Sequence, residues 1–160
     1  MPRLVVLNGP PGIGKSTLAR RYVEDHPAVV SLEQDALRGS LGSHFAARER
    51  CVATARDHLM SGHDVIVPQF VADATYLDRL ATLADDCGAS YVELVLLTSA
   101  ESAERRFHAR ADAPPWAAEL DDYPGEYARL LQALEGRAVT RLPSVGGDID
   151  GTYRLLLAAL

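Results

Sequence analysis

Cysteine is scarce in this sequence of 160 residues, which contains only Cys51 and Cys87. The two stand far apart and belong to no C-x-x-C pattern, which excludes a disulfide framework and a cysteine-based zinc site of the usual spacing. The five histidines likewise show no metal-ligand spacing with cysteines or carboxylates. We therefore expect two buried, reduced thiols.

Long hydrophobic runs are also missing. No apolar stretch approaches the ~18 residues that a membrane-spanning helix needs. The first apolar run stops at Asn8, which is too early for a signal peptide. Repeats and linkers are absent, and 160 residues suit one domain. The sequence thus predicts a cytoplasmic protein with a single domain over residues 1–160.

An excess of positive charge is the third absence. The chain has 16 Lys and Arg against 22 Asp and Glu, so its formal net charge is −6. Proteins that neutralise many nucleic-acid phosphates usually carry a basic stripe, and no such stripe is visible. A nucleic-acid partner is disfavoured on this ground, although it is not excluded.

What the sequence does contain is the octapeptide GPPGIGKS at residues 9–16. It matches the P-loop pattern G-x-x-x-x-G-K-[ST] at every fixed position. A β-branched apolar run at residues 3–7 precedes it, and good helix formers at residues 15–25 follow it. Strand, glycine loop and helix form the context in which loop amides and a helix N-terminus bind phosphates. The motif predicts binding of a nucleoside triphosphate.

The residue types of this motif match that chemistry. Glycines allow the backbone to approach the ligand closely. Lys15 supplies a positive charge for the β- and γ-phosphates, and the Ser16 hydroxyl can ligate Mg²⁺. The residues expected to contact the nucleotide are Gly9, Gly12, Ile13, Gly14, Lys15, Ser16 and Thr17.

Beyond the loop, apolar runs alternate with helical patterns, which predicts βαβ units and a parallel sheet. The expected strands are residues 3–7, 28–32, 64–67, 91–97 and 138–142. In the helix of residues 43–61 we expect Phe45 on the apolar face, and in the last helix we expect Leu157 to be buried. Another helix is expected from Tyr127 onward. Residues 111–124 carry three prolines and cannot form one continuous helix.

A D-x-x-R motif, Asp35 to Arg38, follows the second expected strand. Ligands of parallel sheets gather at the carboxyl ends of the strands, so this pair should face the P-loop crevice. A carboxylate there can accept the proton of a hydroxyl that attacks the γ-phosphate. The alternative is a helix-capping aspartate beside a solvated arginine.

An R-x-x-x-R motif, Arg106 to Arg110, lies at the end of the helix after the fourth strand. Arginines at i and i+4 share a helix face. A planar guanidinium suits both stacking on adenine and bidentate phosphate contact. The alternative is an exposed basic face to which Arg105 also belongs.

The P-loop, the D-x-x-R and the R-x-x-x-R together resemble the small P-loop kinase group. It includes polynucleotide 5′-hydroxyl kinase domains, chloramphenicol phosphotransferase, and shikimate and gluconate kinases. The resemblance implies a three-layer α/β/α fold whose five-stranded parallel sheet has the order 2-3-1-4-5, with a lid at residues 111–124. It also implies ATP and Mg²⁺. Asp35 would act as base or orient the acceptor hydroxyl, Arg38 would bind the acceptor, Arg106 would lie near adenine, and Arg110 would stabilise the transferred phosphoryl group.

The sequence departs from the usual pattern after the third strand. Many P-loop proteins have an aspartate there that helps to hold Mg²⁺, whereas this chain has a proline followed by Gln69 and Phe70. The ion would then depend on Ser16, phosphates and water, with Glu33 or Asp35 as further ligands. Gln69 and Phe70 are expected to line the acceptor pocket, and packing between core and lid is the alternative for Phe70.

The expected lid region is acidic, with five carboxylates and no basic residue over residues 111–128. If it covers the acceptor, it favours a neutral or cationic substrate, and otherwise it is a solvated loop. We therefore predict a kinase that moves the γ-phosphoryl group of ATP to a hydroxyl of a small molecule. The alternatives are a polynucleotide 5′-hydroxyl kinase and a nucleotide-binding regulatory module without transfer activity.

Overall fold

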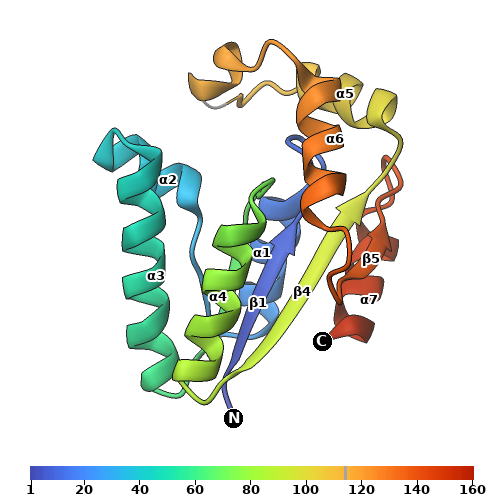
Figure 1. Cartoon of the computed structure of the whole chain (residues 1–160). Coiled ribbons are helices and arrows are strands. Elements are labelled where there is room, and N and C mark those ends of the chain that lie inside the picture. Colours follow the sequence, from blue (N-terminus) through green and yellow to red (C-terminus); the bar gives the residue numbers. More distant parts are fainter. Residues whose placement is uncertain (114) are drawn as a thin grey trace.

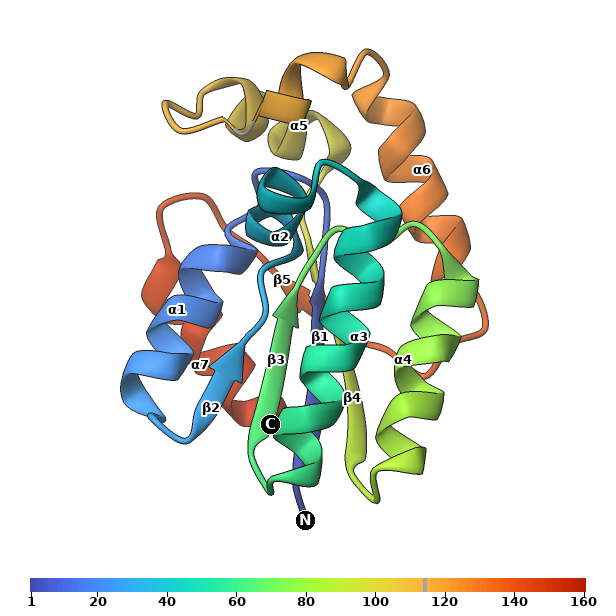
Figure 2. The same ribbon diagram turned by 90° about the vertical axis from the view of Figure 1, so that its left-hand side faces the viewer.

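The computed structural model of the chain describes residues 1–113 and 115–160, and the side chains of these except Ser40, Leu41 and Pro115. Its centre is a five-stranded sheet in the order β2-β3-β1-β4-β5, and all four strand pairs are parallel (Figures 1 and 2). The strands are β1 (Arg3–Asn8), β2 (Val29–Ser31), β3 (Asp64–Pro68), β4 (Ser90–Leu97) and β5 (Thr140–Pro143). The predicted order is confirmed, while β2 and β5 are shorter than the sequence suggested.

Helices cover both faces of the sheet, which makes the three-layer fold expected from the sequence. The helical elements are α1 (Lys15–Asp25), α2 (Gln34–Leu41), α3 (His44–Met60), α4 (Ala74–Asp86), α5 (Ala100–His108), the short 3₁₀ helix η1 (Pro115–Glu119), α6 (Tyr123–Ala133) and α7 (Ile149–Ala159). In Figure 2, α1 and α7 lie on one side of the sheet, and α3 and α4 lie on the other.

The alternation of side chains along β1 explains how the two layers are held. Leu4 and Val6 are buried in the cluster with α3 and α4, whereas Val5 and Leu7 are buried in the cluster with α1 and α7. A central parallel strand is buried on both faces, and therefore it reads as a continuous apolar run rather than an alternating one. This strand ends at Asn8, where the P-loop begins.

Two predictions about buried helix residues are wrong. Phe45 is 73% exposed, because the buried stripe of α3 is the i, i+4 series Ala47, Cys51, Ala55 and Leu59. Leu157 is 41% exposed, because α7 buries Thr152, Tyr153 and Leu156 instead. Both helices contain more apolar residues than their buried faces can hold, so some apolar side chains are exposed.

The start of α6 also differs from the prediction. The helix begins at Tyr123 and not at Tyr127, so Pro124 lies inside its first turn. Proline is tolerated there, because the first N–H groups of a helix have no intrahelical partner. The preceding segment is irregular apart from η1, and Pro114 of the expected lid lies outside the described residues.

Cys51 is buried and Cys87 is half-buried, and both are free thiols. Among the helices of the described residues, none has the length and apolar character needed to span a membrane.

Candidate functional site

The P-loop lies at the carboxyl edge of the sheet, between the end of β1 and the start of α1. Two of its glycines are required by packing as well as by backbone conformation. A Cβ on Gly9 (φ 150°) would lie 2.8 Å from the carbonyl oxygen of Leu96, and one on Gly12 (φ 81°) would lie 2.7 Å from Cα of Phe107. Because real Cβ contacts are longer, only glycine at these positions lets β4 (at Gly9) and α5 (at Gly12) pack directly on the loop.

Asn8 fixes the entrance of the loop, and the sequence reasoning missed it. Its Oδ1 accepts hydrogen bonds from the amides of Gly9 (2.8 Å) and Val71 (2.9 Å), and its Nδ2 donates to the carbonyl of Val71 (2.9 Å). The side chain is fully buried. A polar residue at the end of a buried apolar strand was the available signal, since such a group must find internal partners.

Lys15 folds back over its own loop. Its Nζ donates to the carbonyl oxygens of Gly9 (2.8 Å) and Pro10 (2.9 Å). Desolvation lowers the pKa of Lys15 to about 7, while the charge of Asp35 raises it and that of Arg110 lowers it. Both residues therefore lie close enough to Lys15 for their charges to act on the ammonium group.

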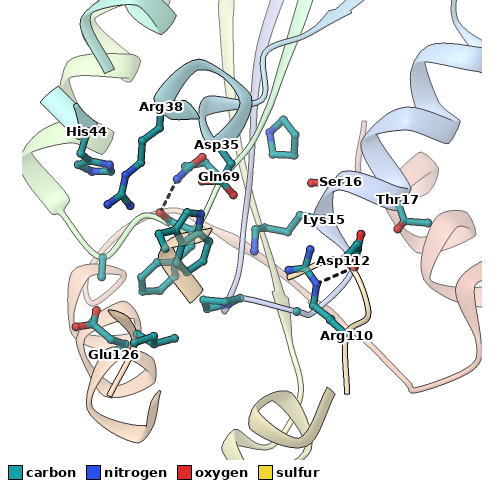
Figure 3. A pocket seen from close by; sticks show the side chains of 18 of the residues that line it. Lys15, Ser16, Thr17, Asp35, Arg38, His44, Gln69, Arg110, Asp112 and Glu126 are labelled. Atoms are coloured by element: carbon teal, nitrogen blue, oxygen red, sulfur yellow. Dashed lines mark hydrogen bonds and ion pairs between the residues drawn. The ribbon is translucent and has the colours of Figure 1, made fainter. Parts of the chain in front are cut away.

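A single cavity of about 630 Å³ joins the loop to the other predicted motifs. Its lining includes eight of the catalytic and nucleotide-contacting residues predicted from the sequence, namely Gly12, Gly14, Lys15, Ser16, Thr17, Asp35, Arg38 and Arg110, whereas Gly9 and Ile13 do not line it. In Figure 3, Lys15 lies between Asp35 and Arg110, and Arg38 lies beside His44. The structure thus brings the three motifs to one site, although they are separated in the sequence.

The D-x-x-R motif forms the first half of α2. Glu33 is the N-cap and Asp35 lies in the first turn, so the alternative of a capping aspartate is wrong. Asp35 is exposed to the cavity, and Arg38 forms a 3.5 Å ion pair with Glu119 of η1. The ion pair between Arg38 and Glu119 therefore links α2 to the segment that follows α5.

The two arginines of the R-x-x-x-R motif reach different places. Arg110 lines the main cavity and pairs with Asp112 at 3.4 Å. Arg106 donates to the carbonyl of Ile13 (2.9 Å) and to Oγ of Ser144 (3.2 Å). It lines a second hollow of about 190 Å³ beside Gly147.

This second hollow adjoins the P-loop on its other side and is built largely by the β5–α7 connection. Arg105 is exposed and pairs with Glu101, whereas Arg106 is half-buried. The alternative of an exposed basic face therefore holds for Arg105 and not for Arg106. A role for Arg106 beside a nucleobase stays a prediction.

The wall opposite the loop contains residues that the sequence reasoning did not identify. Arg48 pairs with Asp73 at 2.5 Å, and its guanidinium lies 4.3 Å above the ring of Tyr76. His44 lies one turn before Arg48 on α3. Burial, followed by the charges of Arg48 and Arg38, lowers the pKa of His44. At neutral pH this wall therefore presents one neutral imidazole and one compensated ion pair.

Gln69 and Phe70 both line the cavity, as expected. Gln69 is 7% exposed, and its backbone amide donates to the carbonyl of Leu7 (3.1 Å). Phe70 also packs against the core cluster under α3 and α4. Contact of Phe70 with an acceptor, and packing of Phe70 between core and lid, stay predictions.

The residues that could hold Mg²⁺ are few. The Ser16 hydroxyl lines the cavity, and so does Asp35, whereas Glu33 does not. No group of three or more His, Cys, Asp or Glu within the described residues is arranged to bind a metal alone. A hydroxyl and one carboxylate fit a Mg²⁺ ion that keeps most of its shell as water and phosphate oxygens.

A parallel sheet in this order, with a glycine loop between its central strand and the following helix, defines a P-loop NTPase fold of the kinase-like type. The chain belongs to the AAA_33 family (AAA domain), whose sequence profile matches residues 4–129. A search of curated protein sequences finds no match.

Solved structures agree with this fold. A gluconokinase from Sinorhizobium meliloti 1021 is 20% identical, with a TM-score of 0.67 over 99% of this chain and 91% of that one. The tunicamycin resistance protein of Deinococcus radiodurans is 22% identical, with a TM-score of 0.68 over 99% and 95%. A chain of the Pnkp1/Rnl/Hen1 RNA repair complex is 22% identical, with a TM-score of 0.70 over 92% of this chain and 50% of that one.

Proposed function

We propose that this protein is an ATP- and Mg²⁺-dependent kinase that transfers the γ-phosphoryl group to a hydroxyl of a small molecule. The observation that carries the proposal is the shared cavity, in which Lys15 and Ser16 of the P-loop lie with Asp35. Phosphoryl transfer is catalysed mainly by positioning and by electrostatic stabilisation of spread charge. One cavity with a phosphate loop at one end and a carboxylate near it meets both needs.

The proposed roles follow from the chemistry of these side chains and from their place in the lining of one cavity. Lys15 exchanges its two loop carbonyl partners for phosphate oxygens, and the loop amides bind the remaining oxygens. Asp35 accepts the proton of the acceptor hydroxyl, and Arg38 orients the acceptor. Arg110, which has one exposed partner in Asp112, neutralises charge on the transferred group.

Ser16 and Asp35 would hold Mg²⁺ through its coordinated water and phosphate oxygens. The ion, when bound, neutralises charge on the β- and γ-phosphates. Arg106 would lie beside the nucleobase in the second hollow.

The decisive experiment measures ADP release from Mg-ATP over a panel of acceptors. The panel contains sugars, nucleosides, hydroxyl-bearing antibiotics and 5′-hydroxyl oligonucleotides. Asp35→Asn is compared with Asp121→Asn, a matched change at an exposed acid that does not line the cavity. We expect acceptor-stimulated turnover that Asp35→Asn reduces by about 100-fold or more and Asp121→Asn leaves unchanged.

Other outcomes would select an alternative. Stimulation by oligonucleotides alone would indicate a polynucleotide 5′-hydroxyl kinase. Tight nucleotide binding with no acceptor-dependent turnover would indicate a regulatory module, and the kinase proposal would be wrong.

A further inference from the structure

We propose that Gln34 and Tyr76 are positioning residues for Asp35, because a buried hydrogen bond between their side chains holds the first turn of α2 against α4. This role rests on the proposed function, in which Asp35 is the base. Neither Gln34 nor Tyr76 lines the cavity. Both therefore act through Asp35 and do not touch the substrate.

Helix α2 turns two faces to different surroundings. Gln34 and Leu37, three residues apart, face the interior, where Gln34 is 1% exposed and Leu37 packs on the core cluster. Asp35 and Arg38, also three residues apart, line the cavity. Adjacent residues of a helix point about 100° apart. An anchor on the side chain of Gln34 therefore fixes the direction in which Asp35 points.

The first turn of α2 has little else to fix it. Within the described part of the chain, the N-cap Glu33 makes no side-chain capping hydrogen bond. The helix has eight residues, which is too short for stability without tertiary contacts. Leu37 supplies apolar packing, which has no preferred direction. The side chain of Gln34 thus gives the directional contact at the end of the helix that carries Asp35.

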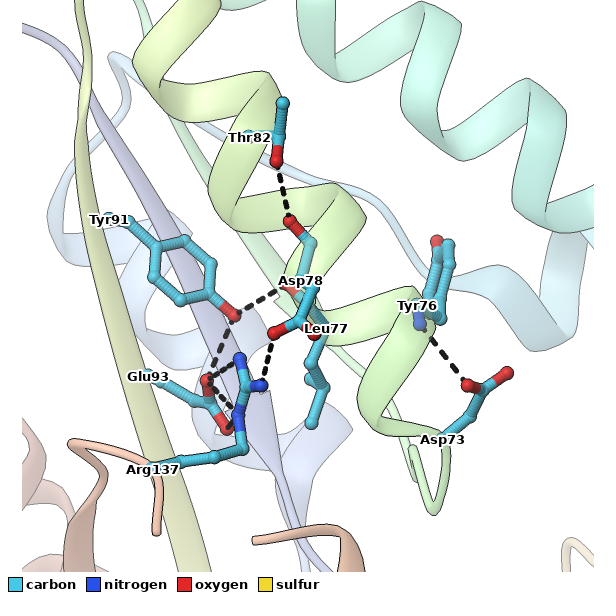
Figure 4. Close-up of polar contacts among 8 residues, drawn as sticks. All are labelled: Asp73, Tyr76, Leu77, Asp78, Thr82, Tyr91, Glu93 and Arg137. Carbon is cyan, nitrogen blue, oxygen red and sulfur yellow. Dashed lines mark hydrogen bonds and ion pairs between the residues drawn. The ribbon is translucent and has the colours of Figure 1, made fainter.

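The partner of Gln34 is itself held in place. The Nε2 of Gln34 donates to the hydroxyl of Tyr76, which lies in the first turn of α4. The backbone amide of Tyr76 donates to Asp73 at 3.2 Å (Figure 4). The guanidinium of Arg48 lies 4.3 Å above the Tyr76 ring and pairs with Asp73. Because α3 and α4 both hold Tyr76, its hydroxyl is a fixed point for α2.

Stability does not explain the amide of Gln34. Burial raises the pKa of the neighbouring Cys51 thiol, whereas hydrogen bonding to Gln34 and Tyr76 lowers it, so three side chains meet here. The Oε1 of Gln34 is buried and has no hydrogen-bond partner among the described residues. A buried unpaired oxygen lowers stability, and a methionine would fill a similar space without it. The amide instead gives a unique arrangement, as buried polar networks can do.

Two substitutions remove the bond and keep the size of each side chain. Gln34→Met removes the amide, and Tyr76→Phe removes the hydroxyl but keeps the ring beneath Arg48. Tyr91→Phe is the matched control, because it removes a half-buried hydroxyl that donates to Glu93 outside the cavity. ADP release with the best acceptor of the panel gives kcat and the KM of ATP for each variant.

We expect Gln34→Met and Tyr76→Phe each to lower kcat by about tenfold or more, because misplacement of a reacting group by about 1 Å can cost about 100-fold. The KM of ATP should change by less than about twofold, since neither residue lines the cavity in which the P-loop lies. Tyr91→Phe should change neither constant. A loss of kcat in Tyr91→Phe equal to that in Tyr76→Phe would overturn the proposal.

The same substitutions in an Asp35→Asn background test whether the two residues act through Asp35. There each should lower kcat by less than about twofold more, because the group that they position is absent. A further tenfold loss in this background would overturn the proposal.

The double variant Gln34→Met with Tyr76→Phe guards against misfolding. It removes both partners of the bond, which a fold tolerates better than one unpaired partner. It should keep the ADP affinity of the wild type and have the kcat of the single variants. A wild-type kcat in the double variant would overturn the proposal.

Hydrogen exchange separates this inference from the kinase proposal. The amide of Leu37 donates to the carbonyl of Glu33 (3.3 Å) at the start of α2. We expect its exchange to be about fivefold faster in Gln34→Met and Tyr76→Phe, the scale of one hydrogen bond, with the amides of α7 unchanged. Faster exchange without turnover of any acceptor would leave the anchoring of α2 standing while the kinase proposal fails. Unchanged exchange would overturn the anchoring itself.

Discussion

The hydroxyl of Tyr123 donates a 2.7 Å hydrogen bond to the carbonyl oxygen of Pro11. Tyr123 is the first residue of α6, and Pro11 lies in the P-loop, 112 positions earlier in the chain. The side chain is 3% exposed, so this contact is shielded from water. It ties the loop to the segment that follows α5, in addition to the packing of Phe107 on Gly12.

Removal of this hydroxyl should loosen the loop. We expect Tyr123→Phe to lower the free energy of unfolding by about 1 kcal/mol, which is a fall of roughly 2–4 °C in Tm. ADP affinity should fall about threefold to tenfold. Tyr127→Phe is the matched control, because Tyr127 bonds the carbonyl of Thr98 instead. Thermal unfolding and calorimetric titration of ADP measure both effects, and equal losses of ADP affinity in the two variants would contradict the prediction.

The close approach of α5 to the loop gives a second prediction. In Gly12→Ala the new methyl group would lie 2.7 Å from the backbone of Phe107 at a φ of 81°. Neither backbone can move without breaking the loop, so we expect ADP binding to fall below detection and stability to fall by more than about 1 kcal/mol.

Gly39→Ala is the matched control for this change. Gly39 lies inside α2, and a Cβ there meets nothing within 4 Å. We expect this variant to be more stable by about 0.5–1 kcal/mol with unchanged ADP affinity. Chemical denaturation compares the two, and ADP binding by Gly12→Ala at wild-type strength would show that the packing argument is wrong.

The lowered pKa of Lys15 predicts uptake of a proton when nucleotide binds. In the empty site the pKa is about 7 rather than 10.5, so the folded state binds fewer protons than the unfolded chain between these values. The stability of the empty protein should therefore rise with pH across this window. Phosphates raise the pKa again, so ADP binding at pH 8.5 should take up close to one proton, and at pH 6 this group should take up almost none.

Lys15 is the only lysine in the chain. Lysine-selective isotopic labelling therefore yields a single side-chain signal, whose titration gives the pKa directly. Calorimetry in buffers of different ionisation enthalpy counts the protons. Lys15→Arg keeps the charge but does not titrate, so it should abolish the pH-dependent uptake. A free-protein pKa near 10 would refute the prediction.

A buried ion network away from the cavity gives a prediction about stability alone (Figure 4). Glu93 on β4 is 5% exposed and accepts hydrogen bonds from Arg137 (2.9 and 3.1 Å) and from Tyr91 (3.1 Å). Arg137 also pairs with Asp78 of α4. Arg137→Met leaves the Glu93 carboxylate buried without its cation, and the expected loss is about 3–5 kcal/mol.

The double variant Arg137→Met with Glu93→Gln should recover part of that loss, because it removes the buried charge as well. Urea denaturation measures both variants. None of these residues lines the cavity, so ADP affinity below the unfolding range should stay at its wild-type value. A double variant less stable than the single one would contradict this account.

The sequence predicts β1, β3 and β4 well because each contains a local apolar run that ends at, or is followed at once by, a proline or polar residue. It predicts β5 less well, because only Leu142 of this strand is buried. The order of the strands came from resemblance and not from those runs. The error at Phe45 has a different origin, since α3 contains apolar residues on more than one side. The choice of Ala47 for the core depends on contacts with β1 and α4 that no helical periodicity records.

The candidate site divides in the same way. Lys15 and Asp35 belong to short motifs that follow strands, and Arg110 belongs to one at the end of a helix. The chemistry of each motif can be read from one stretch of sequence. Asn8, Arg48 and Asp73 were missed because each acquires its place through a partner that is distant in the chain. The sequence signal that could have found Asp73 is its position just before a helix, because Asp73 is the N-cap residue of α4.

The two hollows on either side of the P-loop are assembled from different stretches of the chain. The wall opposite the loop in the larger cavity comes mostly from α2, α3 and the segment after β3, whereas the smaller hollow comes from α5 and the β5–α7 connection. Mutations that reshape one hollow therefore need not disturb the other. Under the proposed function, substitutions within residues 35–73 and 110–126 would change the choice of acceptor, while the hollow around Arg106 stays unchanged.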